Sequence, residues 1–599
     1  MSREQNQFEL IGRPCRNFNI LATAVMTDPL DGREKLVLSN FAAGQTGNLI
    51  LIDTRSMEAE SIELPGDEGA WGLVNWRNEK LVVGTCPNYA YMHALDLKTR
   101  TWAEPLKAAD EKYFWDMAIG SDGNVYAGTW PGCSLYRYDP ALHTLEKLGR
   151  ASDNDKNLYS RYINGSAPGY ILFTGGYDEP FLKAFHMESG TFRDFGTPGF
   201  TVREVTDEYI CTVQGDRFEF YHPQTLEPLP DTAGWKEKLT VLEAALPNGK
   251  SCRAIPLADG RYAGVRGQDL FIADSLDEVP ELVRIPTEAP ATRIHTLVSD
   301  EAGGIWGACG FGQTIFHYDP LTGSAWNSSS VCDSGGEVYG MVFVDGKLYL
   351  TAYVGGDHIV YDPAKPWDQL NNRNPQSLRA LRPDYIRPEG RSVIGPDGGI
   401  WTGWSAKYGT YAGALSRIDP VTLEVDSWSH PIANDQQVAG VAADDRYVYF
   451  TTNGGASGLP YRDVICHFGV WEPGKGLVHE TRFAAGVRPG SAIAAMCAKV
   501  FVKAGSAILV FDRARFRFEQ SIPVEGGCSW MTAAGPDLLA AFCGSRLLFI
   551  DPHSAVVIRT VELPGSVRAA TYTATGDLAF AVEEALYRVP SGFLQSVRS

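Results

Sequence analysis

The sequence predicts an all-β protein built from two tandem β-propellers, each with about seven four-stranded blades. A strand-closing aspartate returns at a fixed interval: Asp53, Asp96 and Asp139 are 43 residues apart, and so are Asp319 and Asp362. A repeat of about 40–50 residues made of short strands is typical of propeller blades. At this period, the 599 residues hold about fourteen blades.

Each repeat alternates β-branched and aromatic strands with turn signals. The clearest copy is FWDMAIGSDGNVYAGTWPGCSLYRYDP at 114–140, where Asp122-Gly123 predicts a hairpin. The stretches 337–363 and 392–420 repeat this pattern, again with Asp-Gly at the turn. Because proline ends strand pairing and aspartate accepts hydrogen bonds from the following backbone, the Asp-Pro endings predict capped turns.

We expect two rings because a single ring of about fourteen blades would exceed the usual four to eight. The least repetitive stretch, 225–290, contains LPDTAGWKEKLTVLEAALPNGK, the one segment with helical character. The boundary is therefore placed near 290, giving a first propeller at 1–290 and a second at 291–599. Closure of one ring by a strand from the far terminus stays open.

The composition restricts the classes of partner. A formal net charge of −19 argues against sequence-independent binding of nucleic acid, which requires clustered Lys and Arg, and against an anionic membrane surface. A local arginine cluster can still attract a small acidic ligand, because charge is screened over about 8–10 Å.

The sequence also bears on location. The N-terminal stretch MSREQNQFELIGRPCRNF has no apolar segment of a secretion signal, and no run reaches the roughly 18 apolar residues that span a bilayer. The 11 cysteines are scattered and form no CxxC, which is typical of reduced, buried thiols. We expect a soluble, cytoplasmic protein.

Only two loops of each blade can contact a ligand at the mouth of a propeller: the loop that precedes the innermost strand and the loop between the second and third strands. In the first half these loops contribute candidate substrate-binding residues Trp115, Asp116, Trp130, Arg161 and Tyr177. In the second half they contribute Arg293, Glu337, Tyr339, Tyr353, His358, Arg387, Trp404, Lys407 and Gln436. The second half also carries two long loops, at 404–413 and 451–462, so we expect the site there.

These residue types suit an acidic sugar, since aromatic faces stack on sugar rings and arginine pairs bidentately with a carboxylate. β-Elimination from a uronic acid needs a base near C5 and a cation for the carboxylate. We assign this catalysis to His295 or Tyr408 with Arg391. Hydrolysis would instead need paired carboxylates, for which Asp116, Glu179 and Glu337 are the loop candidates. The simpler interpretation is that these Trp and Tyr side chains pack between neighbouring blades and do not contact a ligand.

Motifs of other classes are missing. The sequence has no Walker A motif, no GxGxxG before a helix, no HExxH and no GxSxG. We therefore predict no cofactor and no metal. The 11 histidines include no i, i+4 pair, which leaves open only a metal site assembled from separate blades.

The stretches 114–140, 337–420 and 435–460 resemble the bacterial group of YVTN, PQQ-like and virginiamycin-B-lyase-like propellers. AYVGGDHIVYDPAKPW and DQQVAGVAADDRYVYFTTNGGASG look like a tandem-propeller subset associated with carbohydrate utilisation. The tryptophan motifs and calcium-binding acids of PQQ enzymes are not recognisable, so that cofactor is not carried over. The sialidase Asp-box is absent as well.

The prediction is thus a carbohydrate-active enzyme, in first place a lyase that acts by β-elimination on an acidic, uronate-containing oligosaccharide at a propeller funnel. Two alternatives stay open: a non-catalytic propeller scaffold that binds a glycan or a protein partner, and a glycoside hydrolase that uses loop carboxylates.

Overall fold

The computed structural model describes residues 7–230 and 234–598, and these residues form fourteen antiparallel sheets. The chain divides into two compact units, each of which contains seven of the sheets. The N-terminal unit is Phe18–Glu288, and the C-terminal unit is Ala289–Ser599 together with Met1–Asn17. The protein is therefore an all-β tandem propeller, as the repeat predicts.

The N-terminal unit begins with four regular blades. Their strands are β2 (Ile20–Thr27), β3 (Glu34–Asn40), β4 (Asn48–Asp53), β5 (Ala59–Glu63); β6 (Gly69–Trp76), β7 (Lys80–Cys86), β8 (Tyr91–Asp96), β9 (Thr101–Trp102), β10 (Leu106–Lys107); β11 (Tyr113–Ile119), β12 (Val125–Trp130), β13 (Ser134–Asp139), β14 (Thr144–Arg150); β15 (Ser160–Asn164), β16 (Tyr170–Gly175), β17 (Phe181–His186) and β18 (Thr191–Asp194).

The remaining three sheets of this unit are less regular. They are β19 (Thr201–Val205), β20 (Ile210–Gln214), β21 (Arg217–Tyr221); β22 (Glu243–Ala245), β23 (Ser251–Arg253); and β24 (Ile255–Pro256), β25 (Tyr262–Arg266), β26 (Asp269–Ala273), β27 (Val283–Arg284). Residues 231–233 of the segment expected to be helical lie outside the described residues; in its described part the only helical element is the 3₁₀ turn η2 (Trp235–Lys238). The sheet β22–β23 has no counterpart among the repeats visible in the sequence. In the described residues after β21, pairing with this strand is limited to a single bridge between Tyr221 and Pro228. Prolines 223, 228 and 230 account for this, since proline cannot donate to a strand ladder.

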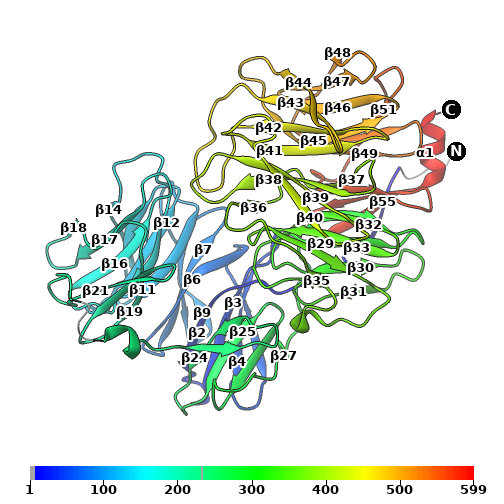
Figure 1. The fold of residues 1–599 in the computed structure, drawn as a ribbon. Helices are drawn as coiled ribbons and strands as arrows, with labels where there is room; N and C mark the ends of the chain where they lie inside the picture. The colour runs from blue at the N-terminus through cyan, green and yellow to red at the C-terminus, as the bar shows by residue number, and fades with distance from the viewer. Residues whose placement is uncertain (1–6, 231–233, 599) are drawn as a thin grey trace. The chain divides into compact units, whose positions relative to one another are not determined.

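The C-terminal unit contains seven blades that follow one another from green to red in Figure 1. They are β28 (Ile294–Ser299), β29 (Ile305–Cys309), β30 (Ile315–Tyr318), β31 (Ala325–Asn327); β32 (Val338–Val344), β33 (Lys347–Ala352), β34 (Asp357–Tyr361), η3 (Gln369–Asn371), β35 (Gln376–Ser377); β36 (Tyr385–Arg387), β37 (Ser392–Ile394), β38 (Ile400–Ala406), β39 (Gly413–Ile418), β40 (Val425–Ser429); β41 (Gln437–Ala443), β42 (Val448–Asn453), β43 (His467–Glu472), β44 (Gly476–Arg482); β45 (Pro489–Met496), β46 (Lys499–Ala504), β47 (Ala507–Asp512), β48 (Arg517–Pro523); β49 (Cys528–Ala533), β50 (Leu539–Cys543), β51 (Arg546–Asp551), β52 (Val556–Glu562); and β53 (Ala569–Tyr572), β54 (Leu578–Val582), β55 (Ala585–Val589), β1 (Glu9–Gly12).

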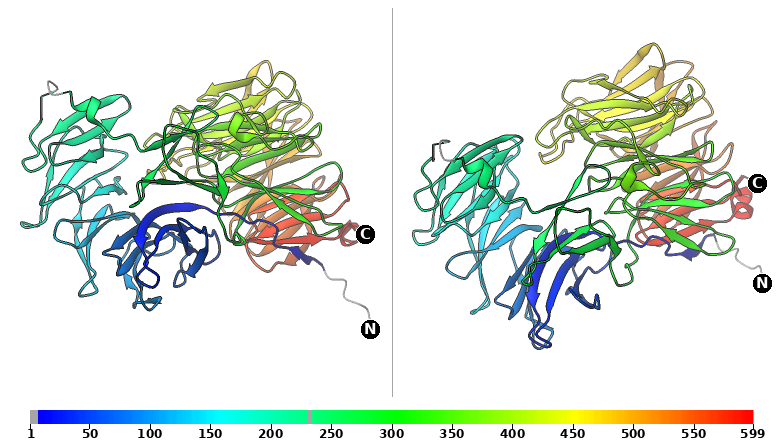
Figure 2. Two further views of the ribbon diagram at one scale, coloured as in Figure 1. Left: turned by 90° about the horizontal axis from the view of Figure 1, so that it is seen from below. Right: turned by 60° about the horizontal axis from the view of Figure 1, so that its bottom comes forward.

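The last blade of the C-terminal unit is completed by the other end of the chain. Strand β1 pairs antiparallel with β55, and Figure 2 shows it in blue beside the red C-terminal strands. Phe8 packs edge-on against Phe580 and Tyr587, and the Tyr318 hydroxyl donates to the Ile11 carbonyl. The innermost strands then form an unbroken ring, because β53 lies beside β28. A short helix that the sequence did not indicate, α1 (Ser591–Arg598), follows β55.

The cores lie between neighbouring sheets, and the second strand of a blade supplies the glycine that brings them close. A Cβ atom on Gly128 of β12 would lie 2.4 Å from the Ser160 carbonyl oxygen of the next blade, and one on Gly84 of β7 would lie 2.6 Å from Phe114 Cβ. Only glycine permits such an approach of two strands. No helix in the described part of the chain is long and apolar enough to cross a lipid bilayer.

The recurring aspartates cap the turns after the third strands, as the sequence predicts. Asp96 Oδ1 accepts hydrogen bonds from the backbone N–H of Lys98 and Thr99, and Asp419 Oδ1 accepts two in the same way. These backbone bonds lower the pKa of both carboxyl groups, since they stabilise the charged form. The 43-residue period thus marks one structural position of the blade.

Candidate functional site

The central channel of the C-terminal unit is lined by its innermost strands. It contains a cavity of about 110 Å³. The residues around this cavity come from β28, β32, β37, β41, β45 and β49 and the turn before β37; they include Thr296, Tyr339, Met341, Gly390, Arg391, Ser392, Val441, Ile493, Ser529 and Trp530. Because ligands bind in concave sites of this kind, the cavity marks the candidate ligand site, and we call the end of the channel that carries it the channel mouth.

Tyr339 and Arg391 line this cavity, and His295 packs against Tyr339. The rings of His295 and Tyr339 are 4.6 Å apart and nearly perpendicular, and the Arg391 guanidinium lies 3.9 Å from the centre of the Trp530 ring. His295 Nε2 and Arg391 Nη1 are buried and have no hydrogen-bond partner among the described residues. The backbone of Arg391 has φ 59°, a left-handed conformation that side chains other than glycine rarely adopt and that is frequent at functional sites.

A second group of polar side chains continues from Tyr339. Arg387 Nη1 donates to the Tyr339 hydroxyl at 2.9 Å, and its guanidinium stacks 3.9 Å above the Tyr353 ring. The hydroxyl groups of Tyr353 and Tyr408 share a hydrogen bond of 2.5 Å. Glu337 is only 8% exposed, and its Oε2 has no partner among the described residues. Buried polar atoms of this kind are costly unless a ligand or water satisfies them.

The electrostatics of the cluster favour an anion. Burial and then the charges of Arg391, Arg568, Arg293 and Arg387 lower the pKa of His295 to about 3, so the imidazole is neutral at pH 7. The His295 side chain is half-buried, and its Nε2 atom is fully buried. Four arginines thus converge on one ring in a protein whose net charge is −19.

The acidic side chains here only partly offset that charge. Glu583 pairs with Arg293 at 2.5 Å. Burial raises the pKa of Glu337 to about 7, against the opposing effect of Arg387. Burial likewise lowers the pKa of Arg391 to about 10, which leaves its guanidinium charged at neutral pH. The mouth therefore combines a neutral base, a titrating acid and a charged arginine within one unit.

The structure brings most of the predicted second-half residues together: His295, Arg391, Glu337, Tyr339, Tyr353, Arg387 and, through Tyr353, Tyr408. Three others were wrongly placed at the mouth. His358 and Trp404 are fully buried and both hydrogen-bond Ser416 Oγ, and Gln436 is held by the Ile465 carbonyl and Thr452. Trp404 lies within β38 and His358 within β34 rather than in loops, and Gln436 directly precedes β41. Because side chains alternate between the faces of a strand, the expected loop position did not tell which of them reach the channel.

Two further predicted residues lie at the edge of the cluster. Lys407 is exposed, and its ammonium group lies 4.0 Å from the carboxylate of Asp384. Arg293 contributes charge to His295 but is engaged with Glu583. Trp530, Arg568 and Glu389 were missed, although Trp530 follows a loop before an innermost strand and the same rule applied to that blade would have found it.

The N-terminal unit holds an aromatic cluster that includes its predicted residues. Trp115 contacts three half-buried rings at 5.1–5.6 Å, those of Trp71, Tyr113 and Tyr159, and Trp130 lies 5.2 Å from Tyr113. The Arg161 guanidinium covers Trp115 at 4.4 Å and donates to the Tyr177 hydroxyl at 2.9 Å. The indole N–H groups of Trp115 and Trp130 are buried without a partner among the described residues.

Asp116 has a structural role in this unit. Its two carboxylate oxygens accept hydrogen bonds from the backbone N–H groups of Met117 and Ile163, both at 2.9 Å, so it ties β11 to β15. Burial raises its pKa to about 6 against those bonds. Each oxygen keeps a further acceptor position, so this structural role leaves Asp116 a predicted sugar contact.

The fold and the two aromatic, arginine-bearing clusters define the class: a tandem propeller with a candidate ligand site in each unit. Searches against family models and curated proteins found no match. Among solved structures, the chain is similar to the extracellular domain of the putative one component system BT4673 from B. thetaiotaomicron, with 11% identity and a TM-score of 0.29. A second structure, described as a putative hybrid two component system BT4673, gives 12% and 0.32. In both, the match covers 98% of this chain and 83% of the other.

Proposed function

We propose that the channel mouth of the C-terminal unit binds a uronate-containing oligosaccharide and cleaves it by β-elimination. The observation that carries this proposal is the pair of buried, unpartnered atoms, Arg391 Nη1 and His295 Nε2, in a field of four arginines. A carboxylate satisfies a guanidinium bidentately, and it would balance the charge that the arginines bring.

The residues suit the three needs of the reaction. Arg391 holds the carboxylate and stabilises the negative charge that develops on it when the proton at C5 leaves. His295 Nε2 takes that proton, the C4–O bond breaks as the C4=C5 double bond forms, and Glu337 supplies a proton to the departing oxygen. Glu337 suits this role because a pKa of about 7 leaves a large part of it protonated at neutral pH.

The low pKa of His295 is a property of the unliganded mouth. Burial is the main cause of this low pKa, and the arginines add to it. A bound carboxylate would offset the part that the arginines contribute, which raises the pKa of the imidazole and makes it a stronger base. Hydrolysis is less well supported, because Asp116 and Glu337 lie in different units and do not form a carboxylate pair within one of them.

A direct test incubates the protein with uronate oligosaccharides and follows the ultraviolet absorbance of the unsaturated product. Replacing His295 by glutamine should lower kcat about 100-fold with little change in KM, since a general base contributes roughly 10²–10⁴. His430→Gln, an exposed histidine of the same unit, serves as the control. Absence of the unsaturated product with every uronate in the panel would rule out the lyase activity.

The affinity for an acidic sugar should fall as the pH rises through about 7. Above its pKa of about 7, Glu337 becomes a carboxylate beside the bound anion, and the two negative charges repel. One linked proton allows at most about a tenfold change per pH unit. Calorimetry from pH 6 to 8.5 should show this decline in the wild type and a flat profile in Glu337→Gln; the same slope in both proteins would contradict the assignment.

A second candidate function is non-catalytic glycan binding by the N-terminal unit, favoured by the two unpartnered indole N–H groups of its aromatic cluster. Trp115→Ala should reduce the affinity of the protein for a glycan at least about tenfold, as removal of a buried aromatic anchor does. Tryptophan fluorescence during titration measures it. An unchanged dissociation constant in Trp115→Ala would exclude this surface.

A further inference from the structure

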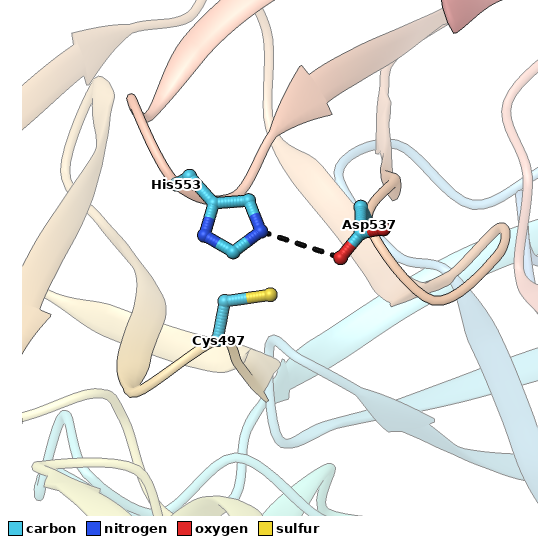
Figure 3. A group of neighbouring side chains, drawn as sticks. All are labelled: Cys497, Asp537 and His553. Atoms are coloured by element: carbon cyan, nitrogen blue, oxygen red, sulfur yellow. Dashed lines mark hydrogen bonds and ion pairs between the residues drawn. The ribbon is translucent and has the colours of Figure 1, made fainter.

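Three side chains with metal-binding atoms meet on the C-terminal unit away from the residues of the channel mouth. Cys497 Sγ, a carboxylate oxygen of Asp537 and a ring nitrogen of His553 all lie within 4.8 Å of one another. Figure 3 shows the His553 ring above the Cys497 side chain, with one ring nitrogen directed at Asp537. The distance from His553 Nε2 to Asp537 Oδ1 is 3.3 Å.

The topology places this group on the face opposite the channel mouth. Cys497 lies in the turn between β45 and β46, Asp537 in the turn between β49 and β50, and His553 in the turn between β51 and β52. In an antiparallel blade, the first and third turns are at one edge of the sheet and the second turn is at the other. Tyr353 follows β33 and lies in the second turn of its blade, and His295 lies at the start of β28, which is at the same edge. The group of Cys497, Asp537 and His553 is at the opposite edge and is therefore separate from the proposed catalytic site.

The backbone around the group is fixed by contacts between the two blades. Lys499, two residues after Cys497, donates its ammonium hydrogen to the His553 carbonyl. The N–H of His553 donates to Asp551 Oδ1 at 2.8 Å. The hairpins that carry Cys497 and His553 are thereby held together.

Cys497 differs from the other cysteines. All eleven lie within the described residues and are free thiols, and ten of them are buried, whereas Cys497 is partly exposed. It occupies a two-residue hairpin turn in which both Cys497 and Ala498 have positive φ, 51° and 59°. Asn-Gly is favoured in such turns, and other side chains are strained there.

We propose that Cys497, Asp537 and His553 bind one zinc ion, with water as the fourth ligand. Thiolate, imidazole and carboxylate together are the donor set that zinc prefers, and three protein ligands with one open position is a common zinc geometry. Bond lengths of 2.0–2.2 Å for nitrogen and oxygen give a tetrahedral edge of about 3.3 Å, which is the separation of His553 Nε2 and Asp537 Oδ1. A small movement of the flexible Cys497 side chain completes the set.

The surroundings leave room for a ligand from solution. Ala534, Gly535 and Pro536, which directly precede Asp537, line a hollow of about 290 Å³ together with residues of α1, among them Arg598. Asp537 and His553 are themselves 58% and 64% exposed. The water on the ion would therefore be exchangeable with a small anion.

Cobalt(II) tests this proposal because a thiolate bound to tetrahedral cobalt gives a charge-transfer band and strong visible d–d bands. Chelator-treated, reduced full-length protein is titrated with cobalt and then with zinc. We expect one equivalent of cobalt to produce these bands and zinc to abolish them. In Cys497→Ala the charge-transfer band should disappear, and in His553→Ala the affinity should fall at least about 100-fold, beyond the effect of a second-shell change. His430→Ala should behave as the wild type.

Two results would overturn the proposal: no charge-transfer band at one equivalent of cobalt, or a band of equal intensity in Cys497→Ala. A fold defect is separated from loss of a ligand by the melting temperature. Zinc should raise it in the wild type and in His430→Ala, because an ion that binds only the folded state stabilises it. A zinc effect of the same size in Asp537→Ala and His553→Ala would also contradict the site.

Discussion

Arg391→Ala is expected to lower kcat/KM for a uronate oligosaccharide about 1000-fold or more. The Arg391 side chain is half-buried, its guanidinium is charged and stacks on Trp530, and its Nη1 is buried without a partner among the described residues. The guanidinium would contact the substrate carboxylate in the ground state and also in the transition state, when further negative charge develops on that carboxylate. Removing one donor to such a charge costs about 10²–10³ in kcat, and loss of the ion pair weakens binding further.

The comparison requires two further variants. Arg391→Lys keeps the charge but loses the bidentate fork, so it should recover only part of the activity. Arg482→Ala removes an exposed arginine of the same unit, 75% accessible, and should leave kcat/KM unchanged. Equal activity of Arg391→Ala and Arg482→Ala in the ultraviolet assay, with both proteins folded, would show that Arg391 does not hold the carboxylate.

Trp401→Ala is expected to lower the free energy of unfolding of the C-terminal unit by about 3–5 kcal/mol. Trp401 is 1% exposed, stacks on Trp428 at 5.0 Å and donates its indole N–H to Asp397 at 3.0 Å. It packs against Val438 and Val441 of the next blade, so its loss leaves a cavity between two sheets. Differential scanning calorimetry of the full chain measures the change as a lower melting temperature.

Trp326→Ala gives the matched control, because that ring is 39% exposed at the edge of its blade. It should shift the melting temperature much less than Trp401→Ala, since surface substitutions are usually worth little. If the two variants melt at the same temperature, the packing of Trp401 between two blades does not contribute the stability that we assign to it.

The period of the aspartates was enough to predict the fold, because each one caps the same turn of a blade. The sheet β22–β23 could not be predicted from the sequence, because two strands of three residues are too short to show an alternating pattern. The addition of β1 to β55 could be raised from the sequence only as an open alternative, because pairing between Glu9 and Arg588 depends on contacts 579 residues apart.

The candidate site was predictable as a set of loops but not residue by residue. Selecting residues from the two loops of each blade that face the mouth gave His295, Arg391 and Glu337, which the structure places in one cluster. It also gave Trp404, whose indole is fully buried and hydrogen-bonded to Ser416. At a strand end, neighbouring side chains point to opposite faces, and only the three-dimensional register decides which of them reaches the channel.

The central claim is that the channel mouth of the C-terminal unit recognises a carboxylate on a sugar. The most direct measurement is calorimetric titration of the wild type and of Arg391→Ala with a uronate oligosaccharide and with the same oligosaccharide after reduction of its carboxyl groups. We predict that the wild type binds the acidic form at least about 100-fold more tightly than the neutral form, and that Arg391→Ala loses this preference. Equal affinity of the wild type for both forms, or an unchanged preference in Arg391→Ala, would contradict the account.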